Sequence, residues 1–206
     1  MRRVEIASRI AATDNLMSRV EYFLLEDHTL IRRAAMELIC NLIAGSDQVF
    51  ERYCGAERMS SSKLLVVLAL CDVDDLPTKL AASGALATLT TAPTACLALL
   101  NIQHDRHRVL HILTQLIDPY LSLPSDKNEH VNAESHPGLT HRGIICARNF
   151  LLSLEDPAVR KEILAEAKSI GLADALAKVA RDEAANDIVS TPALEALKWL
   201  ADSGKG

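Results

Sequence analysis

The chain has 206 residues with 22 basic and 27 acidic side chains, and its net charge of −5 is too small to indicate an acidic tail or a polyanion-binding protein. Apolar residues make up 49% and charged residues 24%, which is typical of a packed globular protein and excludes a wholly disordered chain. Only 3% of the residues are aromatic, a composition that favours helices over sheets.

The chain shows no signal for export or membrane insertion. Its longest apolar run, 64–71, is far shorter than the roughly 20 residues that cross a bilayer, and residues 1–9 lack the hydrophobic segment of a secretory signal. The five cysteines are odd in number, well separated and mostly in apolar runs. We therefore expect a cytoplasmic protein with reduced thiols and no membrane partner.

The first half of the chain has the apolar spacing of helices, separated by residues that favour helix starts. Asp75-Leu76-Pro77 and Thr91-Ala92-Pro93 are two such starts, because proline is tolerated in the first turn of a helix. The predicted helices of this half are 14–26, 29–44, 46–54, 60–71, 77–91 and 93–101.

The second half continues the pattern, with starts at Ser135-His136-Pro137, Asp156-Pro157 and Thr191-Pro192. Residues 118–137 have almost no periodicity and predict a long surface loop, either an insertion between repeats or a functional or disordered segment. No strand is predicted, so the expected fold class is all-α. The predicted helices of this half are 104–117, 138–153, 157–169, 171–181 and 191–203.

A sequence repeat runs through these helices. Residues 31–43 can be laid over 78–90 at an offset of 47, and 141–151 and 192–200 are weaker copies. A period in the forties built from helices is typical of armadillo and HEAT solenoids. We therefore predict one domain over 1–206, a right-handed superhelical solenoid of about four such repeats.

The repeat also predicts how its long helices pack. Small residues should let these helices approach closely, and leucines should fill the shared core. The small residues are Ala34, Ala35, Ala81, Ala82 and Gly84. The leucines are Leu38, Leu42, Leu86 and Leu89.

Residues Ile31–Leu42, with their Arg-Arg-Ala-Ala and Cys-Asn-Leu elements, resemble the best-marked signature of the UCS-domain (Unc/Cro/She) myosin chaperones. Lys79–Thr90, which follows the acidic turn Cys71–Asp75, looks like the family's next repeat, and His141–Ile145 is similar to a third block. The resemblance is to the C-terminal part of a UCS domain. Members carry more repeats before this part, and animal members a TPR domain, so we expect a fragment, a truncated paralogue or a split gene model.

The resemblance implies a protein that binds the myosin motor domain through a concave groove and helps it fold or remain active. It implies no catalysis and no cofactor, and a heat-shock chaperone as a further partner. The groove-lining role falls on polar residues of the matching helices, for each of which the alternative is a solvated or capping side chain. These residues are Arg33, Glu37, Asn41, Ser83, Thr88, Arg142 and Asn149.

If earlier repeats are missing, the first helices should expose an apolar face. The residues expected on that face are Ile6, Ile10, Leu16, Val20 and Phe23.

Other functions find weaker support in the sequence. His104, His107 and His111 share one helix face, but three histidines on one straight helix rarely converge on a metal, so we expect no metal site. Cys54, next to Gly55, is predicted to be the most accessible thiol. Scattered basic residues and few aromatics argue against nucleic-acid binding. The alternatives that remain are an armadillo or HEAT adaptor for another peptide and a small helical enzyme.

Overall fold

The computed structural model describes residues 9–10, 12–54, 58–100, 106–118, 136–182 and 187–202. Every secondary-structure element within these ranges is an α-helix. The chain divides into two compact units, Met1–Leu99 and Leu100–Gly206. The long loop predicted at 118–137 lies almost entirely outside the described residues. The single domain over 1–206 stays a prediction.

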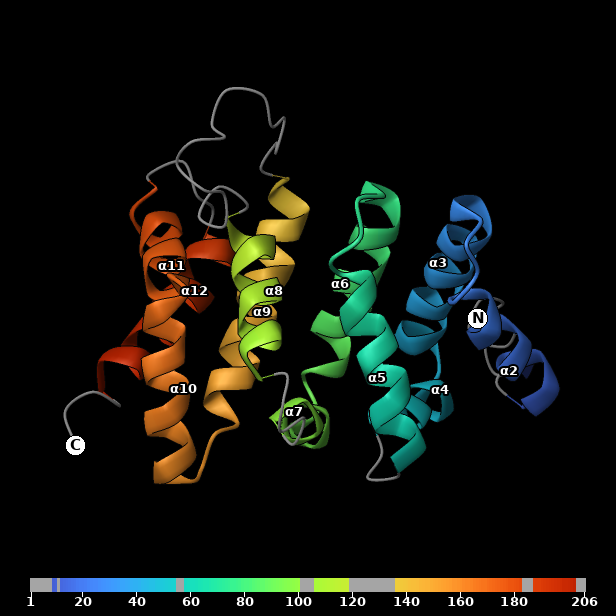
Figure 1. Ribbon diagram of the computed structural model, residues 1–206, viewed down its shortest axis with the longest axis horizontal. Helices are drawn as coiled ribbons and strands as arrows, with labels where there is room; N and C mark the ends of the chain where they lie inside the picture. Colours follow the sequence, from blue (N-terminus) through green and yellow to red (C-terminus); the bar gives the residue numbers. More distant parts are fainter. Residues whose placement is uncertain are drawn as a thin grey trace. The chain divides into compact units, whose positions relative to one another are not determined.

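The first unit is built around the pairing of two long helices. α3 packs along α6 more extensively than any other pair of described helices, so the first two copies of the repeat are neighbours as predicted (Figure 1). Met36 and Ile39 of α3 and Leu86 and Leu89 of α6 are fully buried between these elements and their neighbours. The helices of this unit are α2 (Asp14–Phe23), α3 (Thr29–Gly45), α4 (Asp47–Cys54), α5 (Arg58–Leu70), α6 (Leu76–Leu89) and α7 (Pro93–Leu100).

The second unit repeats this arrangement. α9 packs against both α8 and α12, and α11 packs against α12, so the third and fourth copies of the repeat are also neighbours (Figure 1). Phe150, Ile144 and Leu176 are among its fully buried residues. The helices of this unit are α8 (Arg106–Ile117), α9 (Pro137–Leu152), α10 (Pro157–Ser169), α11 (Leu172–Arg181) and α12 (Asp187–Asp202).

The predicted helix starts are confirmed at several places. Asp75 caps α6 by accepting a hydrogen bond from the backbone N–H of Thr78, and Asp156 caps α10 through the N–H of Ala158. His136 caps α9, where its Nδ1 accepts from the N–H of Gly138 at 3.1 Å. Local capping chemistry is therefore sufficient to place these ends.

The start predicted at Thr191-Pro192 is wrong. α12 begins at Asp187 and continues through Pro192, which is buried. A proline inside a helix lacks one backbone hydrogen bond and crowds the preceding turn, so its packing against the core must offset that cost. Thr191 is therefore an interior helix residue and not a cap.

Two predictions about burial are corrected by the structure. Leu38 is 36% exposed and so is not a core residue, whereas Leu42, Leu86 and Leu89 are buried as expected. Val20, expected on an exposed apolar face, is buried because it packs inward from α2.

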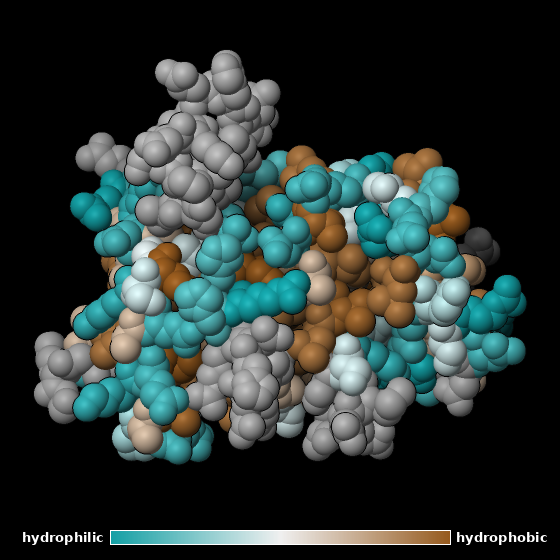
Figure 2. All heavy atoms as spheres, viewed as in Figure 1, coloured by the Kyte–Doolittle hydropathy of each residue, from teal (hydrophilic) through white to brown (hydrophobic). Residues whose placement is uncertain are grey.

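Leu16 and Phe23 of that expected face are 41% and 37% exposed, Ile10 is half-buried, and Ile6 lies outside the described residues. Figure 2 shows hydrophobic residues (brown) reaching the surface of the first unit over α5 and α6. Apolar surface on this unit is thus not confined to α2.

No single described helix is long and apolar enough to span a membrane. α6 and α7, bent by 112° at the break between them, reach such a length and hydropathy only when they are taken together.

Candidate functional site

The four long helices that carry the sequence repeat share one pattern of burial. We call α3, α6, α9 and α12 the repeat helices. In α3 the buried positions are Ala35, Met36, Ile39, Leu42 and Ile43. The corresponding buried residues at α6 are Ala82, Ser83, Leu86, Leu89 and Thr90. In α9 they are Gly143, Ile144, Ala147, Phe150 and Leu151. In α12 they are Pro192, Ala193, Ala196 and Leu200. The inward faces of the repeat helices therefore follow the same register, except that Trp199 of α12, at the position of Leu42, is half-buried.

This register identifies which polar residues are equivalent. Each repeat helix has a polar residue immediately before the position that corresponds to Leu42. These residues are Asn41, Thr88, Asn149 and Lys198. Asn41 and Lys198 are exposed, and Thr88 and Asn149 are half-buried. Lys198 was not among the residues singled out from the sequence, although extending the repeat alignment into 192–200 would have indicated it.

The exposed face of α3 combines polar and apolar side chains. Glu37 and Asn41 lie one turn apart on it, together with Leu30, which is 61% exposed, and Ala34. Asn41 Nδ2 donates a hydrogen bond to the backbone oxygen of Glu37 at 2.9 Å. That bond fixes the amide of Asn41 against its own helix and leaves the side-chain oxygen as an acceptor for a partner.

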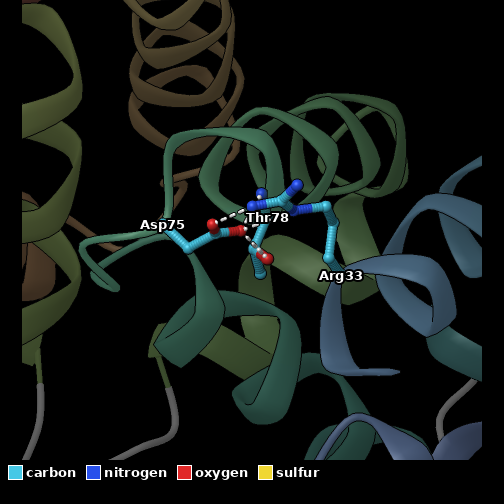
Figure 3. A network of polar contacts seen from close by, with 3 residues as sticks. All are labelled: Arg33, Asp75 and Thr78. Atoms are coloured by element: carbon cyan, nitrogen blue, oxygen red, sulfur yellow. Dashed lines mark hydrogen bonds and ion pairs between the residues drawn. The ribbon is translucent and has the colours of Figure 1, made fainter. Parts of the chain in front are cut away.

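Arg33, also predicted to contact a partner, instead connects the two repeat helices of the first unit (Figure 3). Its Nε donates to Asp75 Oδ2 at 3.1 Å and its Nη2 to Asp75 Oδ1 at 2.5 Å. The same carboxylate accepts from the N–H and hydroxyl of Thr78 at 3.1 and 2.5 Å, so one aspartate both caps α6 and binds α3.

These contacts shift the titration of both partners. Hydrogen bonds from Arg33 and then from Thr78 hold the pKa of the Asp75 carboxyl well below its ordinary value. The hydrogen bond to Asp75 raises the pKa of Arg33. The pair is therefore ionised over the physiological range, and the guanidinium is held on Asp75 while its side chain stays 32% exposed.

The prediction that Ser83 lines a groove is wrong. Ser83 is fully buried, and its hydroxyl donates to the backbone oxygen of Leu80 at 3.1 Å. It occupies the position of Met36 in α3, which faces the core. Thr88 is half-buried and donates to the backbone oxygen of Gly84 at 3.1 Å, a local bond within α6.

In the second unit Arg142 and Asn149 are both half-buried. Asn149 Oδ1 accepts a hydrogen bond from Arg148 Nη1 at 3.2 Å. Arg148 Nε in turn forms an ion pair with Glu195 of α12. An arginine and a carboxylate thus join the repeat helices in each unit, Arg33 with Asp75 in the first and Arg148 with Glu195 in the second.

Of the three histidines predicted to share one helix face, His107 and His111 of α8 stack with their ring centroids 6.2 Å apart. Within the ranges that the structure describes, no three or more His, Cys, Asp or Glu side chains form a group able to hold a metal ion. His107 Nδ1 lies 3.1 Å from Glu166 Oε1 of α10, and His104 lies outside the described residues.

Cys54, predicted to be the most accessible thiol, is instead buried. Burial raises its pKa to about 11, which makes a thiolate scarce at neutral pH. Cys40 is the most exposed of the five, and none of them is in a disulfide.

The fold and this site define an all-α armadillo-type repeat protein that presents polar side chains along its repeat helices. No protein-family model matches the chain. UNC-45 from Drosophila melanogaster superposes with a TM-score of 0.68 at 25% sequence identity, covering 97% of this chain and 22% of that structure. An engineered protein superposes with a TM-score of 0.64 at 13% identity, covering 97% of this chain and 68% of its own, a likeness that concerns the fold alone.

Sequence relatives agree with the structural likeness. Ring assembly protein 3 of Schizosaccharomyces pombe is 30% identical over 166 residues, which is 76% of this chain and 18% of that protein. Protein unc-45 homolog B of Mus musculus is 30% identical over 186 residues, which is 90% of this chain and 17% of that protein. The chain spans less than a fifth of the length of these curated relatives.

The chain is therefore a homologue of the UCS-domain myosin chaperones, and the resemblance found in its repeat motifs is confirmed. The predicted all-α, armadillo-type fold is confirmed as well. These relatives are chaperone-type proteins and not enzymes. The right-handed superhelical arrangement of the whole chain stays a prediction.

Proposed function

We propose that this chain is a myosin-directed chaperone module. In this proposal it acts in the cytoplasm without catalysis or cofactor, binds the myosin motor domain through the exposed faces of its repeat helices, and helps the motor domain fold or stay stable. The observation that carries the proposal is the homology to UNC-45 and Ring assembly protein 3 over most of the chain.

The chemistry of the α3 face supports binding to an extended protein segment. The side-chain oxygen of Asn41 can accept a backbone N–H, and the carboxylate of Glu37 can accept from a donor one turn away. Leu30 and Ala34 add apolar contact on the same face. Each polar contact contributes about 0.5–1.5 kcal/mol, so useful affinity requires several of them at once.

Capture of a purified myosin motor domain by the immobilised chain tests the proposal. The double substitution Glu37→Ala and Asn41→Ala removes two contacts from an exposed face and should weaken capture roughly five- to 150-fold. Gln48→Ala is the matched control, because Gln48 is an exposed amide on α4, which is not one of the repeat helices.

A second measurement tests the chaperone role. The unaltered chain should slow heat-induced aggregation of the motor domain, and the double variant should protect it less. Equal capture of unrelated unfolded proteins would indicate a general adaptor instead, and absence of capture would refute the proposed function.

A further inference from the structure

A pocket of about 540 Å³ lies within the second unit, among residues of α9, α10 and α12. Its volume is within the range of roughly 300–1,000 Å³ that is usual for ligand-binding pockets. None of the residues predicted from the sequence lines it. The lining residues are Arg148, Leu152, Arg160, Glu195, Lys198, Trp199 and Asp202.

The apolar part of the pocket is formed by Trp199 and Leu152. Trp199 is half-buried and Leu152 is 47% exposed, so both present surface to an incoming ligand. The guanidinium carbon of Arg160 lies 5.9 Å from the centre of the Trp199 ring. Arg160 Nε donates to the backbone oxygen of Leu154 at 2.5 Å, which fixes the guanidinium at this place.

The charges around the pocket do not balance. Three cationic and two anionic side chains line it, and Arg148 and Glu195 neutralise each other as an ion pair. Arg160 bonds to a neutral carbonyl, and Lys198 is exposed. The two cations that remain face one carboxylate, that of Asp202, so the pocket has an excess of positive charge beside an apolar wall.

The excess positive charge and the apolar wall together indicate which chemical groups the pocket can bind. A carboxylate would neutralise the excess positive charge, and an aliphatic or aromatic group would pack on Trp199 and Leu152. The lining has one more cationic than anionic side chain, which suits a single carboxylate and not the row of phosphates of a nucleic acid.

We infer that this pocket binds an extended peptide segment in which an acidic side chain lies next to an apolar one. The acidic side chain meets Lys198 and Arg160, and the apolar one packs on Trp199 and Leu152. The inference deepens the proposed function, on which it rests, by stating the chemistry of the client segment that the second unit holds. Lys198 lines this pocket and also occupies the position in α12 that is equivalent to Asn41 in α3.

Trp199 makes the test direct, because it is the single tryptophan of the chain and its fluorescence reports on this pocket alone. The probe is a short synthetic peptide in which glutamates alternate with leucines, without aromatic residues of its own. Titration with this peptide should change the Trp199 emission in a saturable way, and the affinity should fall as salt is added. The same peptide with glutamine in place of glutamate should bind about tenfold more weakly.

A pair of lysine variants completes the test. Lys198→Gln removes the charge and keeps most of the side chain, so it should weaken binding of the glutamate peptide about three- to tenfold. Lys161→Gln should leave the affinity unchanged, because Lys161 is an exposed lysine of α10 that does not line the pocket.

The outcomes separate this inference from the proposed function. Equal binding of the glutamate and glutamine peptides, no effect of Lys198→Gln, or the same saturable change with inorganic phosphate alone would overturn the peptide site. Capture of the motor domain without peptide binding would refute the pocket assignment and leave the proposed function standing. Peptide binding without capture of the motor domain would refute the proposed function and leave the pocket assignment standing.

Discussion

Replacing Gly143 by alanine tests the close contact between α9 and α8. A Cβ atom added at Gly143 would lie 2.9 Å from the Cβ of Leu116, 3.0 Å from the Cγ1 of Ile117 and 3.2 Å from the backbone nitrogen of Ile117. These separations are shorter than the roughly 3.5–4.0 Å of ordinary carbon contacts. Because two of the three atoms belong to the backbone or are fixed to it, relief requires α8 to move.

Two opposing effects decide the size of the change. Overpacking a close helix contact costs about 1–3 kcal/mol, whereas alanine in place of glycine inside a helix gains about 0.5–1 kcal/mol. We therefore expect Gly143→Ala to lower the free energy of unfolding by up to about 2.5 kcal/mol. Denaturant unfolding followed by far-ultraviolet circular dichroism measures this difference.

Gly84→Ala is the matched control. Gly84 is an interior residue of α6 and is partly exposed, so the gain in helix propensity should dominate and stabilise the protein by about 0.5–1 kcal/mol. If Gly143→Ala proves as stabilising as Gly84→Ala, the tight packing of α9 on α8 is refuted.

Two further predictions follow from titratable groups. The Asp75 carboxyl has a lowered pKa in the folded protein, so its pairing with Arg33 stabilises the fold above the ordinary carboxyl pKa of 3.8 and is lost as the pH falls through the folded pKa. Asp75→Asn should therefore lower the melting temperature most near pH 7 and progressively less in acid; a difference that does not change with pH would contradict the ion pair. In thiol labelling at pH 8, Cys54 should react only when the protein unfolds and Cys40 first in the native state, because burial raises the pKa of Cys54 to about 11. Rapid native-state labelling of Cys54 would show that it is not buried.

The exposure of a candidate-site residue can be predicted where it follows from the spacing of residues along a single helix. Glu37 and Asn41 are four residues apart on a helix whose other face is apolar, so their exposure was expected and is observed. The prediction for Ser83 is wrong because its position in the repeat, and not the polarity of its side chain, decides whether it is buried. It corresponds to Met36, and a buried serine satisfies its hydroxyl with a carbonyl of its own helix at little cost.

Contacts between distant segments could not be predicted in this way. Arg33 and Asp75 are 42 positions apart, and either residue alone suits an exposed helix end equally well. The pocket around Trp199 combines side chains of α9, α10 and α12, and no local pattern marks them as neighbours.

The sequence alone determined the helices, the repeat and the family, because apolar spacing, caps and repeat motifs are local properties of the chain. The tertiary structure decided which polar side chains remain available to a partner, since that depends on what each one meets when helices far apart in sequence pack together. The guanidinium of Arg33 is bound to Asp75, which joins α3 to the start of α6, whereas Lys198 is exposed at the edge of a pocket.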